Sequence, residues 1–204
     1  MSLADPNVEI HDKLRLINEL DRKTNRACHS SEDRATLCWN PEKREYLLKA
    51  YGVMGNRHPD QLSLLLVEDS PADVYLVREA MRREGLRVDW DIADDGEWAI
   101  RRIDEVDSNA SAPCPDVLLL DLNVPRRTGD EVLERIRQSP RLAHTPVVIM
   151  TSSASPADRD RLMKLGATEY FRKPSNLRDF MKLGRLVREV HERCARLEQE
   201  RAGL

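Results

Sequence analysis

The amino-acid sequence predicts an α/β protein with a doubly wound, five-stranded parallel sheet, an N-terminal helical extension and a long C-terminal helix. Two observations predict this fold class. From residue 62 onward, short apolar runs suited to buried strands alternate with segments of helical period, which is the order that a parallel sheet requires. In addition, four of these runs end in polar residues, as expected where the strands of an open sheet share one carboxyl edge.

Each predicted strand is an apolar or alternating run bounded by turn residues. We expect strands at 62–67, 87–93, 117–120, 147–150 and 168–172. The run at 62–67 is apolar throughout and suits a strand buried on both faces. The run at 87–93 alternates and suits a strand nearer the edge of the sheet.

The predicted helices are marked by their caps and breakers. Ser70 and Ser155 each precede a proline and an acid in the first turn, which is typical of a helix N-terminus. Gly166 ends one of the helices. We expect helices from Ser70 to about Glu84, over 95–106, over 130–138, from Ser155 to Leu165, and from near Ser175 onward, with a loop at 106–115.

The 204 residues suffice for one domain of ordinary size and an appendage of about 60 residues. We divide the chain into an extension with a linker at 1–61, the α/β domain at 62–183 and a helical extension at 184–204. Within 1–61, apolar residues at helical spacing predict an amphipathic helix over 8–27.

A second helix is predicted to begin at Asn40-Pro41 and to end at Gly52, followed by a linker at 55–61. Three interpretations of the N-terminal segment stay open. It is a loosely attached extension that is partly helical or disordered, a folded partner-binding module, or an upstream read-through without a role.

Composition and charge exclude several function classes. The 33 basic and 36 acidic side chains give a net charge of −3, so the chain lacks the basic excess that nucleic-acid binding requires. No apolar stretch approaches the about 20 residues of a membrane span, and the N-terminus does not have the order of a signal peptide. We therefore expect a cytoplasmic protein without membrane or nucleic-acid partners.

The four cysteines are scattered without paired spacing, which favours free thiols in a reducing compartment. A zinc site can be considered for one group of neighbouring residues. These are Cys28, His29, Cys38 and His58. Their intervals fit no standard ligand pattern, so unliganded side chains are the favoured interpretation.

Polar residues follow four of the predicted strands, and the topology brings them to one edge of the sheet. They are Glu68, Asp69, Asp121, Thr151 and Lys173. Three carboxylates that lie this close together require a counter-charge, and a hard divalent cation such as Mg²⁺ is the natural one. Together with a hydroxyl and an ammonium group, the set suits the handling of a phosphoryl group.

Four motifs carry a resemblance to the receiver domain of two-component response regulators. They are LLLVEDSPAD at 64–73, LLLDLNVPRRTGDEVL at 118–133, PVVIMTSSA at 146–154 and GATEYFRKP at 166–174. The resemblance covers roughly residues 62 to 183 and implies the flavodoxin-like strand order 2-1-3-4-5. The wording VEDSPAD and DLNVPR is also similar to small stand-alone receivers that partner bacterial phytochrome kinases.

The resemblance also implies the role of each site residue. Asp121 is the expected phosphoacceptor, assisted by the charge of Lys173 and the hydroxyl of Thr151. The expected metal ligands of Mg²⁺ are Asp69, Asp121, the backbone carbonyl of Asn123 and, through water, Glu68.

Further along the last strand, the resemblance implies a switching role for Tyr170. Its ring would change position as Thr151 moves, with the small Ser152 leaving room for it. A fixed, half-buried aromatic is the alternative for Tyr170. The resemblance also implies a cis peptide before Pro174.

The expected function is that of a single-domain response regulator, phosphorylated by a sensor histidine kinase and acting through protein contacts. It would not be an enzyme beyond its own phosphorylation and dephosphorylation. A pseudo-receiver adaptor is one alternative, although it would be expected to have lost Asp121, Lys173 or an acid. A phosphatase resembling the haloacid dehalogenases is another, but Asn123 stands where those enzymes carry a second aspartate as general acid.

The C-terminal helix is predicted to run from Asn176 to about Arg201, about 26 residues or about 39 Å, because the segment holds no proline and only Gly184 inside it. Beyond Leu183 its apolar residues continue as a stripe, ending at Leu197. We expect this stripe to lie on a second copy of the chain, on the helix at 8–27, or on a kinase, with a homodimer favoured. A solvated tail is the alternative.

Overall fold

The computed structural model describes residues 37–40, 45–48, 61–153 and 155–202. The chain divides into two compact units, residues 1–59 and 60–204. The helix predicted at 8–27, all of the predicted linker except its last residue, and three of the four residues considered for zinc lie outside the described residues.

In the first unit, strands β1 (Leu37–Asn40) and β2 (Glu45–Leu48) form an antiparallel pair in which Leu37 lies opposite Leu48. The prediction of a helix from Asn40-Pro41 to Gly52 is therefore wrong at Glu45–Leu48, which forms a strand. Asparagine followed by proline favours a turn as well as a helix N-terminus. The aromatic residues of the two strands pair across the ladder, Trp39 with Tyr46, a combination that stabilises strands.

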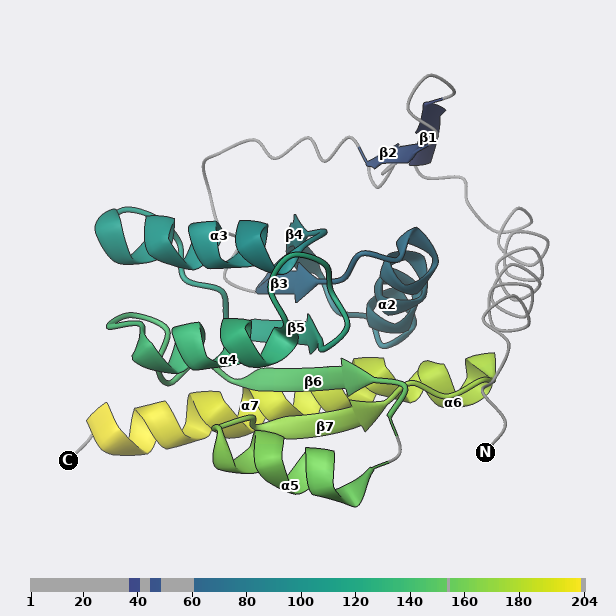
Figure 1. Cartoon of the computed structure of the whole chain (residues 1–204). Helices are drawn as coiled ribbons and strands as arrows, with labels where there is room; N and C mark the ends of the chain where they lie inside the picture. Colours follow the sequence, from purple (N-terminus) through teal and green to yellow (C-terminus); the bar gives the residue numbers. More distant parts are fainter. Residues whose placement is uncertain (1–36, 41–44, 49–60, 154, 203–204) are drawn as a thin grey trace. The chain divides into compact units, whose positions relative to one another are not determined.

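The second unit is built on a five-stranded parallel sheet. Its strands are β3 (Leu62–Val67), β4 (Val88–Ala93), β5 (Val117–Asp121), β6 (Val147–Thr151) and β7 (Glu169–Arg172). Their order in the sheet is β4-β3-β5-β6-β7, and every pair is parallel. This is the order 2-1-3-4-5, and the predicted fold class is confirmed. In Figure 1 the arrowheads of β3, β5, β6 and β7 point the same way, so that these strands end at one edge.

Six helices are described in this unit. They are α2 (Pro71–Arg83), α3 (Gly96–Ser108), α4 (Gly129–Gln138), α5 (Pro156–Lys164), α6 (Leu177–Phe180) and α7 (Lys182–Ala202). Side-chain caps begin five of them, at Ser70, Asp95, Thr128, Ser155 and Asn176. Each cap oxygen accepts a backbone N–H of the first turn, which would otherwise lack a partner.

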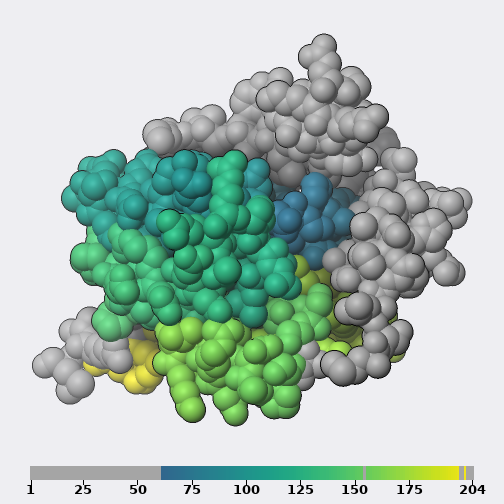
Figure 2. All heavy atoms as spheres, viewed as in Figure 1, coloured from purple at the N-terminus to yellow at the C-terminus, as the bar shows by residue number. Residues whose placement is uncertain are grey.

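The central strands are buried on both faces, which explains their uniformly apolar sequences. All residues of β3, β5 and β6 are buried. Leu65, Leu118 and Ile149 join one core cluster with residues of α3, α4 and α5. These three helices form much of the surface that Figure 2 presents, whereas α7 passes behind β6 and β7 in Figure 1.

The C-terminal segment differs from the single helix of about 26 residues that we predicted. It consists of the short α6 and the 21-residue α7, separated at Met181. Each piece packs on a different element. Phe180 of α6 contacts Phe171 of β7 edge to face, with ring centroids 5.8 Å apart, whereas α7 packs against α2.

The apolar stripe of α7 is mostly covered within the structure. Val187 and Val190 are buried, with 0% and 1% exposure, whereas Leu197 is 49% exposed. The prediction that the stripe projects past its own core beyond Leu183 is therefore wrong for these two valines. Among the stripe residues whose side chains are described, Leu197 is the large apolar one that stays exposed.

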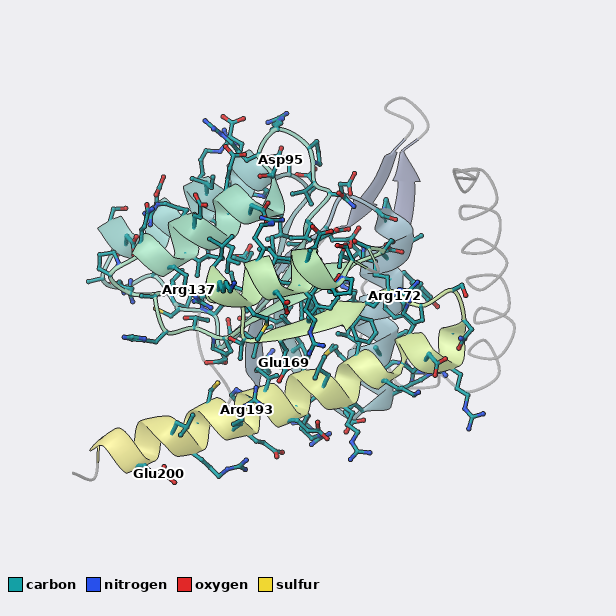
Figure 3. The ribbon with its side chains drawn as sticks, turned by 60° about the horizontal axis from the view of Figure 1, so that its bottom comes forward. Asp95, Arg137, Glu169, Arg172, Arg193 and Glu200 are labelled. Atoms are coloured by element: carbon teal, nitrogen blue, oxygen red, sulfur yellow. The ribbon has the colours of Figure 1, made fainter. Side chains whose placement is uncertain are left out.

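Polar contacts fix α7 along its length. Arg188 donates to the Glu84 carboxylate at 2.9 Å and also to the Glu84 carbonyl, beyond the last turn of α2. Farther along, Arg193 forms an ion pair with Glu169 of β7 at 3.0 Å, and Figure 3 shows the two labelled side chains between α7 and the sheet. Charged partners at a helix C-terminus satisfy carbonyl groups that lack helical partners.

A glycine permits the close approach of α7 to α2. A Cβ on Gly184 would lie 2.3 Å from the Ala80 carbonyl oxygen, which belongs to the backbone and cannot move aside cheaply. We expect Gly184→Ala to lower the free energy of unfolding by about 1–3 kcal/mol through overpacking. Helix propensity alone predicts the opposite sign, a gain of roughly 0.5–1 kcal/mol. Urea denaturation measures the difference.

The neighbouring variant Arg185→Ala is the control, because that side chain is 76% exposed. We expect it to change the free energy of unfolding by less than about 0.5 kcal/mol. A stabilised Gly184→Ala protein would contradict the close contact between α2 and α7.

Within the described parts of the chain, no helix combines the length and the apolar character that a membrane crossing requires.

Candidate functional site

The carboxyl ends of four strands bring the predicted site residues together. Glu68 and Asp69 follow β3, Asp121 ends β5, Thr151 ends β6, and Lys173 follows β7. The backbone N–H of Lys173 donates to the carbonyl of Thr151 at 2.8 Å, so the last two of these positions are joined directly. The sheet topology therefore places all five side chains at one edge, as predicted.

Three of these residues form an acidic cluster. Glu68, Asp69 and Asp121 each offer a carboxylate oxygen, and these oxygens lie within 4.8 Å of one another. Glu68 and Asp121 are buried, with 2% and 6% exposure, whereas Asp69 is exposed. Carboxylates at this separation repel one another strongly, so a hard divalent cation with oxygen ligands fits the donor set.

Lys173 lies at the centre of the site. Its side chain is only 6% exposed, and its Nζ donates to Glu68 Oε2 at 2.7 Å, to Asp73 Oδ2 at 2.8 Å and to Asp121 Oδ2 at 2.5 Å. Burial alone would lower the pKa of this ammonium group. The attraction of Glu68, Asp73 and Asp121 outweighs burial and holds the pKa of Lys173 above its usual range. Lys173 therefore stays charged and in contact with Asp121.

Burial has the opposite consequence for the acids. It raises the pKa of Glu68 to about 8, with Asp73 and Asp121 adding to the rise and Lys173 opposing it. Burial also raises the pKa of Asp69, and the charge of Asp121 contributes in the same direction. In the absence of a metal ion, burial therefore favours the protonated forms of both acids.

This shift predicts how the stability of the metal-free protein depends on pH. Folded Glu68 keeps its proton up to about pH 8, whereas the unfolded residue releases it near its ordinary pKa of 4.5. The stabilisation is therefore complete below pH 4.5 and is lost as the pH rises towards about 8. We expect the melting temperature in a chelator to fall across this window.

Glu68→Gln should make that fall much shallower, because the amide does not titrate. Lys173 remains charged throughout and adds no slope within the window. Differential scanning calorimetry at several pH values measures the slope, and equally steep profiles for both proteins would contradict the assignment to Glu68.

The loop after β5 holds Asp121 from the other side. The N–H of Asn123 donates to Asp121 Oδ1 at 3.0 Å, which leaves Oδ2 for Lys173. Gly129 lies directly behind, and a Cβ there would lie 2.6 Å from the Asp121 carbonyl oxygen. In the same loop Arg126 has a φ of 68°, a strained value for a residue other than glycine. The role expected for the Asn123 carbonyl as a metal ligand stays a prediction.

Thr151 and Tyr170 are linked through one residue of the loop after β6. The buried Thr151 accepts the N–H of Ser153 on its Oγ1 at 3.1 Å. Tyr170 donates its hydroxyl to the carbonyl of the same Ser153 at 2.8 Å, and its ring is half-buried against the core. Ser152 is exposed. The predicted switching of Tyr170 remains a prediction.

Two features differ from the expectations for this site. The described residues contain no cis peptide bond, so the cis peptide expected before Pro174 is wrong for this structure; trans is the lower-energy form even before proline. Asp73 was not predicted as a site residue, because an acid in the first turn of a helix already has a local explanation. Its position four residues after Asp69, on a helix that begins at the same edge, was the available signal.

Fold and site together define a class of protein. A parallel sheet of order 2-1-3-4-5, with an acidic cluster and a buried lysine at its carboxyl edge, has the architecture of a receiver domain. The chain belongs to the response regulator receiver domain family, whose family model matches residues 64–184.

Several similar proteins within this family are phytochrome response regulators or are named with them. The response regulator Rcp1 of Synechocystis sp. is 37% identical over 120 residues, which cover 59% of this chain and 82% of Rcp1. A crystal structure of the phosphorylated cyanobacterial phytochrome response regulator RcpA is 31% identical, has a TM-score of 0.57, and matches 63% of this chain and 92% of that one. The Mn²⁺-bound form of Rcp1 matches with 35% identity and a TM-score of 0.55, over 61% of this chain and 91% of Rcp1. The chain is thus related to phytochrome response regulators.

Proposed function

We propose that this protein is a response regulator that accepts a phosphoryl group on Asp121 from a sensor histidine kinase, in the presence of Mg²⁺. The observation that carries the proposal is the contact of the Lys173 ammonium with Asp121 Oδ2, inside a cluster of acids at the carboxyl edge of the sheet. A carboxylate so placed can attack phosphorus. The protein would act as a phosphoacceptor and would catalyse only its own phosphorylation and dephosphorylation.

Glu68, Asp69, Asp121 and the backbone carbonyl of Asn123 would hold the Mg²⁺ ion, with Glu68 acting through water. The bound ion would supply positive charge for the phosphoryl oxygens, which is the main requirement of phosphoryl transfer. The acidic cluster supports this role, since three carboxylates close together favour a bound divalent cation.

The transfer itself exchanges two bonds to phosphorus. A carboxylate oxygen of Asp121 attacks the phosphorus of a phosphohistidine, so an O–P bond forms. The P–N bond to the imidazole breaks, and its electron pair stays on the nitrogen, which takes up a proton. Lys173 keeps its charge throughout and stabilises the negative oxygens, while the Thr151 hydroxyl would donate to one of them.

The hydrogen bonds of the loop after β6 support a route from the phosphoryl group to the surface. In the described structure Thr151 accepts the N–H of Ser153, whose carbonyl accepts the hydroxyl of Tyr170. If Thr151 turns towards a phosphoryl oxygen, both contacts of Ser153 change. Tyr170 and the start of α5 would then move, with Ser152 giving the ring space.

Two alternatives are less well supported. A pseudo-receiver adaptor does not need the contact of Lys173 with Asp121, and a phosphatase of the haloacid dehalogenase kind needs a second acid where Asn123 stands. Membership in the receiver family favours phosphoacceptance over both.

The names of the relatives support a phytochrome-type kinase as the partner. The net charge of −3 supports a function without nucleic acid, and we place the protein in the cytoplasm. We also propose that two copies associate through the end of α7, where Leu197 is exposed. The apolar surface available for this contact is smaller than expected, because Val187 and Val190 are buried. We therefore expect a weak homodimer, which light scattering would test.

Incubation with acetyl phosphate tests the proposal. We expect intact-mass spectrometry to detect one added phosphoryl group when Mg²⁺ is present and none when a chelator is present. An unchanged mass in both samples, with folding verified by circular dichroism, would favour the pseudo-receiver.

A further inference from the structure

Two helices of the second unit begin with the same four residues, Ser-Pro-Ala-Asp. The first copy, 70–73, opens α2, and the second, 155–158, opens α5. In both, the serine hydroxyl accepts the N–H of the aspartate three residues later, at 3.3 Å. The local caps of the two helices are therefore alike.

In a reciprocal cap, the acid three residues after the cap residue accepts the backbone N–H of that residue. The aspartate of each Ser-Pro-Ala-Asp copy does not make this hydrogen bond. At α4 the cap is complete, because Glu131 also accepts the N–H of Thr128 at 2.8 Å. In α2 and α5 a side chain two residues upstream takes that N–H. Ser70 N donates to Glu68 Oε1 at 3.1 Å, and Ser155 N donates to Ser153 Oγ at 3.2 Å.

The carboxylates of both aspartates instead contact residues at the carboxyl edge of the sheet, where the candidate site lies. Asp73 accepts the ammonium of Lys173 at 2.8 Å, and Asp158 accepts the hydroxyl of Ser153 at 2.9 Å. Asp73 is buried, with 1% exposure, and lies outside the acidic cluster of Glu68, Asp69 and Asp121. A buried carboxylate in contact with a buried ammonium forms a strong, directional hydrogen bond.

We propose that Asp73 is a positioning residue that holds the Lys173 ammonium in place while Asp121 is phosphorylated. This inference rests on the proposed function. Of the three carboxylates that contact Lys173, Asp121 would change on gaining the phosphoryl group, and Glu68 would help to hold the metal ion through water. Asp73 is the one contact that the reaction leaves unaltered, so it can keep Lys173 directed at the phosphoryl oxygens.

The first test observes Lys173 without any phosphorylation. Ammonium protons held by three buried acceptors exchange slowly with water, so ¹H–¹⁵N spectra of the metal-free protein should contain a Lys173 ammonium signal that is absent from Lys173→Ala. We expect Asp73→Ala to shift this signal or to broaden it by faster exchange. The control Asp158→Ala removes the same first-turn acid from the other Ser-Pro-Ala-Asp helix and should leave the signal unchanged.

The isosteric variant Asp73→Asn provides the same test if Asp73→Ala does not fold, which circular dichroism decides. A Lys173 signal with the wild-type position and exchange rate in the folded variant would overturn the proposal. This result does not depend on phosphorylation and so separates the inference from the proposed function.

The second test is a double-mutant cycle on the rate of phosphorylation by acetyl phosphate at saturating Mg²⁺. We expect Asp73→Ala to lower the rate about tenfold in the wild-type background, the scale expected for one hydrogen bond to a charged group. In the Lys173→Ala background the same substitution should change the rate by less than about twofold. An equal loss in both backgrounds would assign Asp73 a role in α2 alone and overturn the proposal, whereas a wild-type protein that takes up no phosphoryl group would refute the proposed function instead.

Discussion

Asp121→Asn is expected to abolish phosphorylation. The amide has the shape of the carboxylate and can still accept the N–H of Asn123, so the loop after β5 should keep its place. It is not a nucleophile, however, and it removes the charge that Lys173 contacts. Labelling with acetyl phosphate and Mg²⁺, followed by intact-mass spectrometry, should give no signal above the level of a metal-free sample.

The matched control is Asp130→Asn, which changes an aspartate at the start of α4. Asp130 pairs with Arg161 on the surface and has no described contact with the acidic cluster. We expect this variant to be labelled at the wild-type rate within about twofold. Equal labelling of the Asp121→Asn variant and the wild type would show that another residue accepts the phosphoryl group.

Asp69→Ala is expected to weaken Mg²⁺ binding by about a hundredfold and thereby to prevent labelling at millimolar metal. Opposite unit charges about 4 Å apart interact by roughly 4 kcal/mol near a protein surface. The exposure of Asp69 reduces this value through solvent screening. The loss of one of three carboxylate ligands remains large. Isothermal titration calorimetry with MgCl₂ measures the affinity.

Asp94→Ala controls for the general negative charge of this edge. Asp94 follows β4 at the carboxyl end of the sheet and is exposed, but it is not part of the acidic cluster. We expect its substitution to change Mg²⁺ affinity by less than about threefold. A similar loss of Mg²⁺ affinity in Asp69→Ala and Asp94→Ala would indicate that the ion is attracted by the general negative charge of this edge and is not bound by the acidic cluster.

The α/β domain could be predicted well from sequence because its local signals agree. The apolar runs of β3, β5 and β6 are buried on both faces, and Ser70 and Ser155 cap helices as expected. The strand order came from the family resemblance, since periodicity does not determine which strands are neighbours. The site residues at strand ends followed from the topology, because parallel strands end at one edge.

The errors arose where one local signal has two outcomes. Asn40-Pro41 suits a helix start or a turn, and Glu45–Leu48 forms a strand. The break at Met181 has no local breaker; it separates a segment that packs on β7 from one that packs on α2. Asp73 was missed because its partner Lys173 lies far away in the sequence, so only the folded chain reveals the contact.

Locating the phosphoryl group by peptide mapping tests the central claim most directly. Borohydride reduces an aspartyl phosphate to homoserine, which leaves a stable mark at the modified residue. After incubation with acetyl phosphate and Mg²⁺, tandem mass spectrometry should find homoserine at position 121, the last residue of β5. Homoserine at Asp69, at Asp73 or at any other position, with an intact Asp121, would contradict the account.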